Sequence, residues 1–232
     1  MSAFVSAVIV AAGGSVRMGS AESKQFIPLL GKPAIEYTLR AFEACGLISE
    51  IVVVCRDSDA ERIKTIAADS GIGKLSAVVN GGESRAHSVK NGIAAASAEA
   101  KYYAIHDGAR PLITPSEIES VVKAAFESGA ATLGTAVTDT VKIVDENGTI
   151  ESTPLRSALR AVQTPQVFDS ELYSFALEKA EHRLGEFTDD CSLIEDMGGE
   201  VTVVDGSAEN IKLTTPIDIV IAESILKARG ES

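Results

Sequence analysis

Short apolar runs alternate along this chain with stretches whose apolar residues have helical spacing. Residues 3–10 (AFVSAVIV) and 51–55 (IVVVC) are too short for typical helices and rich in apolar or β-branched residues, a pattern typical of buried strands. Between them, Ile35, Leu39 and Phe42 share one face of a predicted helix. Alternation of this kind predicts a parallel sheet that helices cover on both faces.

The same alternation continues through most of the chain. Thr114 and Glu117 form a capping box with Pro115 at the first helical position, so a helix begins there and ends near Gly129. Pro216 opens a closing helix on which Ile217, Ile221 and Ile225 line one face. The other predicted strands are at 77–79 and 102–106, with buried strands at 131–137 and 201–204. Helices are predicted at 59–68, after 84, at 170–182 and after 189, and a turn at 164–166. We predict one domain over residues 1–232, with a mostly parallel, Rossmann-like sheet.

The alternation breaks between residues 138 and 160. Two strand-like runs, 141–144 and 149–152, flank Asn147 and Gly148, and an Asn-Gly pair in that position predicts a β-hairpin. A two-stranded ribbon is marginally stable alone, so we expect this β-arm to pack against a second copy of the chain and to serve dimerisation. A surface hairpin without a partner is the alternative.

Charge narrows the class of ligand. The chain has 21 Lys and Arg against 33 Asp and Glu, a net charge of −12, and no basic run. Such a protein repels nucleic acid and anionic membrane surfaces, and no apolar run approaches the ~20 residues that span a bilayer. Its cations stand singly in Gly and Pro loops, as suits a small anionic ligand. We expect neither nucleic acid nor a membrane as a partner.

The cysteines indicate the compartment. Cys45, Cys55 and Cys191 are odd in number, widely separated and without a C-x-x-C pair, so neither a disulfide framework nor a zinc site is predicted. The N-terminus runs directly into a strand pattern, without the features of a signal peptide. A cytoplasmic protein is the expectation.

Candidate chemistry begins in the loop after the first strand. Ala11, Ala12 and Gly13 have almost no side chain, so their backbone N–H groups can approach an anion closely. Arg17 and Lys24 follow. The planar guanidinium of arginine and the mobile ammonium of lysine suit the binding of a triphosphate. The loop matches neither common Gly-rich phosphate motif, so a tight turn with two solvated cations stays open as an alternative.

Two later strands end in similar loops. Gly81 and Gly82 precede Ser84, Arg85 and Ser88 at the start of a helix, which again places small residues and helix-start N–H groups at the end of a strand. After the strand at 102–106 comes HDGARP, residues 106–111, with a carboxylate and a guanidinium three residues apart on a Gly-containing turn.

Separated motifs along nearly the whole chain resemble one family. They are VIVAAGGSVRMG with SKQF, GGESRAHSV, HDGARP, TDTVK, RSALRAVQTPQ, FTDDCSLIE and NIKLTTPID, in the family's order and spacing. The family is that of the 2-C-methyl-D-erythritol 4-phosphate cytidylyltransferases, enzymes of the non-mevalonate isoprenoid pathway. The family pattern often has a second glycine where this chain has Ser15 and a glutamate where it has Ser84.

The resemblance implies a fold and a reaction. The fold is a mostly parallel nucleotide-binding sheet with a β-arm that reaches across a homodimer. In the reaction, a phosphate oxygen of methylerythritol phosphate attacks the α-phosphorus of CTP, which gives 4-diphosphocytidyl-2-C-methyl-D-erythritol and pyrophosphate. The nucleophile is already an anion near neutral pH, so charge neutralisation and in-line positioning must supply most of the catalysis.

The resemblance also assigns roles to single residues. Arg17 and Lys24 would contact the triphosphate and the leaving pyrophosphate, and Lys212 would steady the α-phosphate. The residues expected to frame the nucleoside are Ala11, Ala12, Gly13, Gly82, Ser88 and Gly108. Those expected to serve the sugar-alcohol phosphate, some of them from the other subunit, are Thr140, Arg156 and Thr164. Arg110 either joins this set or braces its own loop.

Asp107 is the carboxylate we expect to hold Mg²⁺, a hard ion that takes one carboxylate together with phosphate oxygens and water. His106 has no partner histidine at ligand spacing, which favours a structural role. Asp189 and Asp190 are interpreted as helix-start charges that complement the helix dipole.

Two other functions remain open from the sequence. One is cytidylyl transfer to ribitol 5-phosphate, although HDGARP and RSALRAVQTPQ look more like the methylerythritol enzymes. The other is a non-catalytic nucleotide-binding protein, which would have no need for Asp107, Lys24 and Lys212 together.

Overall fold

A seven-stranded sheet forms the centre of the protein. The computed structural model describes residues 3–13 and 23–231. The strand order is β11-β7-β10-β6-β1-β4-β5. The strands of this sheet are β1 (Val5–Val10), β4 (Glu50–Cys55), β5 (Leu75–Asn80), β6 (Tyr102–Asp107), β7 (Ala130–Ala136), β10 (Arg160–Asp169) and β11 (Thr202–Asp205). Only β10 runs antiparallel to its neighbours, β6 and β7, among these strands. The prediction of a mostly parallel α/β sheet is confirmed.

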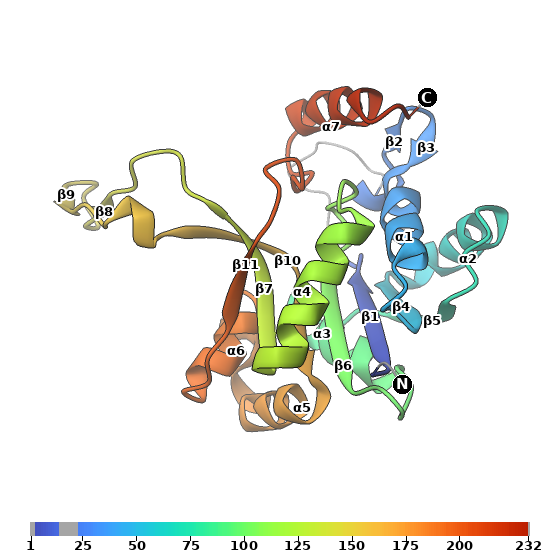
Figure 1. Cartoon of the computed structure of the whole chain (residues 1–232), viewed down its shortest axis with the longest axis horizontal. Coiled ribbons are helices and arrows are strands. Elements are labelled where there is room, and N and C mark those ends of the chain that lie inside the picture. The colour runs from blue at the N-terminus through green and yellow to red at the C-terminus, as the bar shows by residue number, and fades with distance from the viewer. Residues whose placement is uncertain (1–2, 14–22, 232) are drawn as a thin grey trace.

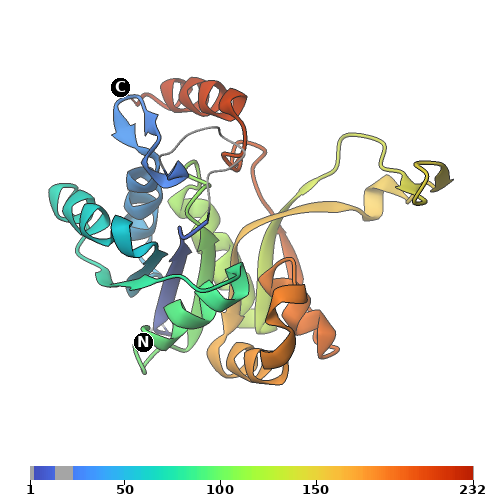
Figure 2. The same ribbon diagram turned by 180° about the vertical axis from the view of Figure 1, so that it is seen from behind.

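Helices cover both faces of this sheet (Figures 1 and 2). The helices are α1 (Ala34–Ala44), α2 (Ala60–Asp69), α3 (Arg85–Ala94), α4 (Pro115–Ser128), α5 (Ser170–Lys179), α6 (Asp190–Asp196) and α7 (Pro216–Ala228). One core joins α1, α2 and α4 to inward residues of the sheet such as Ile9 and Val53. The other joins α3, α5 and α6 to residues of the opposite face such as Val8 and Ile105. Adjacent strand positions thus point into different cores, as the pleat requires.

The helix boundaries follow local sequence chemistry. Thr114 and Glu117 form the predicted capping box at the start of α4, and Gly129 ends that helix with φ +80°, a conformation that only glycine adopts without strain. α3 packs closely on the sheet because Gly92 has no side chain. A Cβ atom there would lie 2.5 Å from Cγ1 of Val8 and 2.7 Å from Cγ2 of Val54.

Three predictions about local structure were wrong. The predicted turn at 164–166 lies inside β10, which contains a cis Thr164–Pro165 peptide, shifts its register against β7 between Val162 and Gln166, and pairs with both β6 and β7. β11 is an edge strand rather than a buried one, and Val203 is 44% exposed on it. The third concerns α7, where Ile217 and Ile221 are exposed, because this helix buries Ala222 and Leu226 against a small cluster near the hairpin of β2 (Pro28–Leu29) and β3 (Lys32–Pro33).

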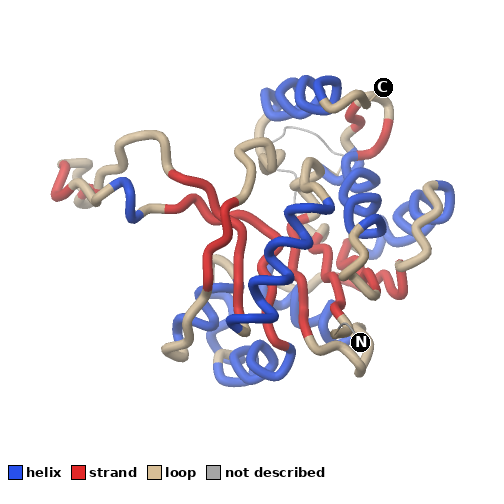
Figure 3. Tube along the Cα trace, in the orientation of Figure 1, coloured by secondary structure: helices blue, strands red, loops and turns tan. Residues whose placement is uncertain are grey.

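The β-arm leaves the body of the protein between β7 and β10. It contains the paired strands β8 (Ile143–Val144) and β9 (Ile150–Ser152), and a 3₁₀ helix, η4 (Arg156–Ala158). The predicted hairpin is confirmed, and Figures 1 and 3 show it reaching away from the sheet. Its apolar side chains have no core to enter: Ile150 is 58% exposed and Leu155 is 73% exposed.

Among the described residues, no helix combines the length and the apolar character that crossing a bilayer requires.

Candidate active site

A cavity of about 360 Å³ opens at the carboxyl ends of β1, β5 and β6. It brings together the three loops that the sequence singled out, with two lysines from elsewhere in the chain. The described residues that line it are Val10, Ala11, Ala12, Gly13, Lys24, Gln25, Gly82, Glu83, Ser84, Arg85, Ser88, Asp107, Ala109 and Lys212. Arg17 lies outside the described residues.

Small residues let these loops approach one another. A Cβ atom on Gly81 would lie 2.4 Å from the Cβ of Ala12, and one on Gly108 would lie 3.1 Å from the Cβ of Ala11. Backbone hydrogen bonds fix the approach, since Gly81 N–H donates to the carbonyl of Cys55 and Gly108 N–H to that of Val10. Gly108 therefore packs behind the first loop and is not among the described residues that line the cavity.

Ser88 organises the second loop. Its hydroxyl donates to the Ser84 carbonyl at 3.0 Å and accepts from the Gly82 N–H at 3.0 Å. Ser84 itself caps α3, where its side chain accepts a hydrogen bond from the His87 N–H. A serine in place of the family's frequent glutamate therefore supplies a helix cap here.

Lys24 enters the cavity from the 3₁₀ helix η2 (Lys24–Phe26). Its Nζ donates to the Leu213 carbonyl at 3.3 Å. Asp59 anchors this segment, because its Oδ2 accepts from the Ser23 hydroxyl at 2.9 Å and from Gln25 Nε2 at 3.0 Å. A carboxylate from the start of α2 thus sets the position of a cation on the cavity wall.

Asp107 lies between two cations. Its Oδ1 accepts from Arg85 Nε at 3.0 Å, and its Oδ2 accepts from Lys212 Nζ at 2.6 Å. Burial alone would raise the pKa of Asp107, but the charges of Arg85 and Lys212 hold it well below its usual range. Asp107 is therefore ionised at neutral pH.

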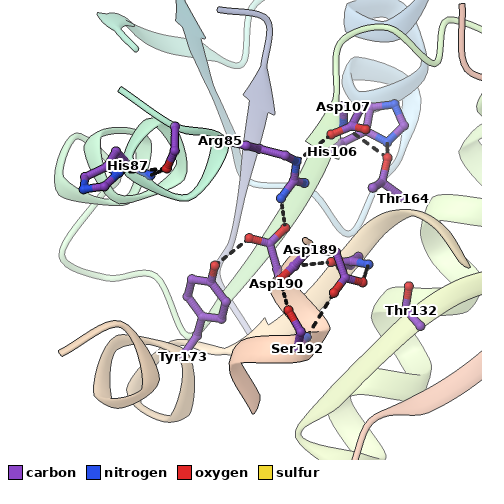
Figure 4. A network of polar contacts seen from close by, with 12 residues as sticks. Arg85, His87, His106, Asp107, Thr132, Thr164, Tyr173, Asp189, Asp190 and Ser192 are labelled. Atoms are coloured by element: carbon purple, nitrogen blue, oxygen red, sulfur yellow. Dashed lines mark hydrogen bonds and ion pairs between the residues drawn. The ribbon is translucent and has the colours of Figure 1, made fainter. Parts of the chain in front are cut away.

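Arg85 also contacts a second carboxylate beneath the cavity (Figure 4). Its Nη1 donates to Asp190 Oδ2 at 2.7 Å, and the Tyr173 hydroxyl donates to Asp190 Oδ1 at 2.6 Å. Burial disfavours the charge of Arg85, but Asp190 and Asp107 outweigh it and raise the pKa of Arg85. Burial also raises the pKa of Asp190, against the opposing effect of Arg85.

Asp189 and Asp190 both stand at the start of α6, as the sequence predicted, but Asp190 has further contacts that the sequence did not indicate. Asp189 caps α6 and accepts from the Ser192 N–H at 3.0 Å. Asp190 is the first residue of α6, is 1% exposed and also belongs to the network around Arg85.

His106 is fully buried and has a partner at each ring nitrogen. The Arg110 carbonyl can only accept, so His106 Nε2 donates to it at 3.2 Å and Nδ1 accepts from the Thr164 hydroxyl at 2.9 Å (Figure 4). Burial lowers the pKa of His106 to about 4, so the ring is neutral. Thr164 Oγ1 also accepts from the Asp107 N–H at 3.1 Å, which fixes the HDGARP loop to β10.

Arg110 and Asn210 hold the loop that carries Lys212. Asn210 is fully buried. Its side-chain amide donates to the Thr164 backbone carbonyl at 3.0 Å, and its own backbone carbonyl accepts from Arg110 Nη1 at 2.7 Å. The Leu213 N–H donates to the Ala109 carbonyl at 2.8 Å. In this structure Arg110 and Thr164 lie behind the cavity wall, and neither is among its described lining residues.

The two predicted site residues on the arm lie outside the cavity. Thr140 and Arg156 are both exposed, and Arg156 Nη1 donates to the Thr138 carbonyl at 3.0 Å. Of the described residues that line the cavity, none comes from 138–160.

Sequence reasoning missed Arg85, Asp190 and Asp59. Arg85 and Asp190 both stand in motifs that carry the family resemblance, GGESRAHSV and FTDDCSLIE, but 105 positions separate them. Asp59 stands at the start of a predicted helix, where a surface role is the simplest explanation. No local signal shows that any of these side chains faces a partner from a distant segment.

Loops at the carboxyl ends of parallel strands, lined by small residues and cations, are the arrangement in which α/β proteins commonly bind the phosphate groups of nucleotides, and this chain has that arrangement. The profile of the family described as 2-C-methyl-D-erythritol 4-phosphate cytidylyltransferase matches residues 5–228. The chain belongs to this family, whose members are nucleotidyltransferases of isoprenoid biosynthesis.

Relatives and solved structures agree with this assignment. The curated protein of that name from Pelotomaculum thermopropionicum is 42% identical to this chain, over 97% of this chain and 95% of the relative. The one from Caldanaerobacter subterraneus is 44% identical, over 96% of this chain and 99% of the relative. A crystal structure of 4-diphosphocytidyl-2C-methyl-D-erythritol synthase from Anaerococcus prevotii superposes with a TM-score of 0.87 at 31% identity and covers 97% of both chains. The cytidylyltransferase of Thermus thermophilus gives a TM-score of 0.77 at 32% identity, over 97% of this chain and 99% of that one.

Proposed function

We propose that the cavity between β1, β5 and β6 is where CTP and 2-C-methyl-D-erythritol 4-phosphate react. A phosphate oxygen of the alcohol phosphate forms a bond to the α-phosphorus, the bond from that phosphorus to the bridging oxygen breaks, and pyrophosphate leaves. The observation that carries the proposal is the meeting of Lys24, Arg85, Asp107 and Lys212 around one cavity with small-residue walls.

Charge and position carry the chemistry in this proposal. Lys24, with Arg17, binds the triphosphate and the leaving pyrophosphate, and Lys212 neutralises the charge that grows on the α-phosphate. Lys212 is 43% exposed, so it can leave Asp107 for a phosphate without crossing a packed core. Backbone groups of the small-residue loops frame the nucleoside, at Ala11, Ala12, Gly13, Gly82 and Ser88, with Gly108 packed behind them.

Asp107 is the group we propose for Mg²⁺. Among the described residues no cluster of three or more acids, histidines or cysteines forms a ready-made metal cage. A single carboxylate beside a phosphate site nevertheless fits Mg²⁺, which completes its shell with phosphate oxygens and water. Asp107 faces the cavity, is ionised, and has spare lone pairs beyond its bonds to Arg85 and Lys212. When bound, the ion would offset part of the charge of the triphosphate.

The β-arm supports the proposal of a homodimer. Exposed apolar residues gather on a two-stranded ribbon that its own chain does not cover, and Thr140 and Arg156 stand on this arm away from the cavity. We infer that the arm, at about 138–160, brings these residues to the partner's site, where they bind the sugar-alcohol phosphate, while Thr164 and Arg110 of the body support that site from behind the cavity wall. Residues 1–232 then act as one nucleotidyltransferase domain with an arm that completes a neighbour.

We also infer that the enzyme works in the cytoplasm, without nucleic acid or membrane partners. The support is its nucleotide substrate, its net charge of −12 and its three cysteines, which are all free and buried.

The test is pyrophosphate release from CTP with each candidate alcohol phosphate. We expect turnover with methylerythritol phosphate and little with ribitol 5-phosphate. We also expect CTP to be used far better than ATP, because loops of Ala and Gly backbone leave little room for a purine. Comparable turnover with ATP, or a preference for ribitol 5-phosphate, would contradict the proposal, and binding of CTP without turnover would favour a non-catalytic protein.

A further inference from the structure

Asp190 is a buried carboxylate that lies beneath the cavity. It is 1% exposed, and both of its oxygens have donors, Arg85 Nη1 at 2.7 Å and the Tyr173 hydroxyl at 2.6 Å. Its backbone N–H donates to Gln166 Oε1 at 2.9 Å, which ties the residue to β10. Asp190 is therefore held by partners from three separate elements (Figure 4).

Arg85 connects this buried carboxylate to the cavity. One edge of its guanidinium reaches Asp190, and its Nε reaches Asp107 at 3.0 Å. The side chain is 28% exposed and lines the cavity. A planar fork can bond two carboxylates at once in a fixed geometry, which the single ammonium of lysine does poorly.

The two cations on Asp107 are held differently. Lys212 is 43% exposed on the cavity side, whereas Arg85 is fixed from below by Asp190. When Lys212 turns from Asp107 to a phosphate, Arg85 is left to hold the carboxylate in place.

We propose that Asp190 is a positioning residue, which through Arg85 fixes the orientation of Asp107 while Lys212 exchanges Asp107 for the nucleotide. This inference rests on the proposed function of the cavity. Stability alone is a weak reason for such a network, because a buried ion pair commonly gives no more stability than well-packed apolar residues of similar volume.

The experiment compares Asp190→Asn with a matched control, Glu50→Gln. Glu50 is also a buried carboxylate, 7% exposed, and it accepts from the Ser6 hydroxyl and the Ser97 N–H at the amino end of β4, the opposite end from the cavity. Both variants should lose stability in urea unfolding. We expect Asp190→Asn to lower kcat by about tenfold or more with KM for CTP within about threefold, since small misplacements cost this much. Glu50→Gln should leave both constants unchanged.

Arg85→Lys tests the link from Asp190 to Asp107, because lysine keeps the positive charge and lacks the planar guanidinium that bonds both carboxylates. It should lower kcat as Asp190→Asn does, and the double variant should be no slower than the slower single one, because the two residues act in series. The inference would be overturned if the kcat losses of the two single variants multiplied in the double variant. It would also be overturned if Asp190→Asn kept kcat within about twofold of wild type, or if Glu50→Gln lost as much kcat as Asp190→Asn. If Asp190→Asn does not fold, Arg85→Lys takes its place in the test, and a kcat within about twofold of wild type for that variant would overturn the inference. A wild-type protein that releases no pyrophosphate would instead reject the proposed function, and this inference with it.

Discussion

A mixed dimer can show whether the β-arm completes the site of a partner. If Arg156 acts across the interface, each site combines Lys24 of one chain with Arg156 of the other. Lys24→Ala and Arg156→Ala homodimers then have two defective sites each. In a mixed dimer of these two chains one site collects both defects and the other has none, because the two sites are related by two-fold symmetry.

The expected recovery follows from counting. Random mixing of equal amounts gives about half mixed dimers, and each has one intact site of two, so activity should rise to about a quarter of wild type per site. The chains are co-expressed or refolded together with different affinity tags, and mixed dimers are purified before the pyrophosphate assay. A purified mixed dimer should have about half the wild-type activity.

The control pairs two residues of the body. Lys24 and Lys212 line the same cavity of one chain, so a mixed dimer of Lys24→Ala and Lys212→Ala has no intact site and should stay inactive. If mixed dimers of Lys24→Ala and Arg156→Ala form and are no more active than the parents, Arg156 serves its own chain or none.

Three further predictions concern single positions. Lys212→Ala should lower kcat by about 10²-fold, the usual effect of removing one preorganised charge-stabilising group, and a loss under threefold in the pyrophosphate assay would make it a surface cation. Gly92→Ala should destabilise the fold by about 1–2 kcal/mol in urea unfolding, because overpacking against Val8 outweighs the better helix propensity of alanine, whereas Gly185→Ala, with open space around it, should change little. Burial raises the pKa of Cys55 to about 11 and all three cysteines are buried, so no thiol should react quickly with a disulfide reagent at pH 8 until urea unfolds the protein; fast reaction of the native protein would contradict this packing.

Periodicity and end signals predicted the body of the fold because they are local. The capping box at Thr114, the helix end at Gly129 and the buried face of α1 each depend on a few adjacent residues, and each was found where the pattern placed it. The turn predicted around Pro165 failed for a non-local reason. A proline usually interrupts a strand, but here β7 pairs with β10 on both sides of Pro165, and β6 pairs with β10 directly after it.

Exposure was harder to predict than secondary structure. Ile217 and Ile221 have the spacing of a buried helix face, yet α7 turns Ala222 and Leu226 inward because only a small cluster lies beneath it. The apolar residues at 201–204 predicted a buried strand, although β11 lies at the edge of the sheet and is largely exposed. Periodicity gives the repeat of a pattern, whereas the face that is buried depends on which elements arrive from elsewhere.

The candidate site divides in the same way. Small residues and cations in loops could be read from the sequence, and the structure brings Ala12, Lys24, Asp107 and Lys212 to one cavity. The role of Asp190 beneath the cavity could not be predicted, because Asp190 contacts Arg85 from a segment 105 positions further along the chain.

Each of the three described cations on the cavity wall, Lys24, Arg85 and Lys212, is held by a residue that lies behind it or beside it. Asp59 anchors the segment of Lys24, Asn210 anchors the loop of Lys212, and Asp190 holds Arg85. The proposed reaction needs no strong base, so its rate depends on where these charges stand when the α-phosphate is attacked. We therefore expect the residues behind the wall to affect turnover, although none of the three is among the described lining residues. Positioning of this kind requires several distant segments to meet, which is why only the folded chain shows it.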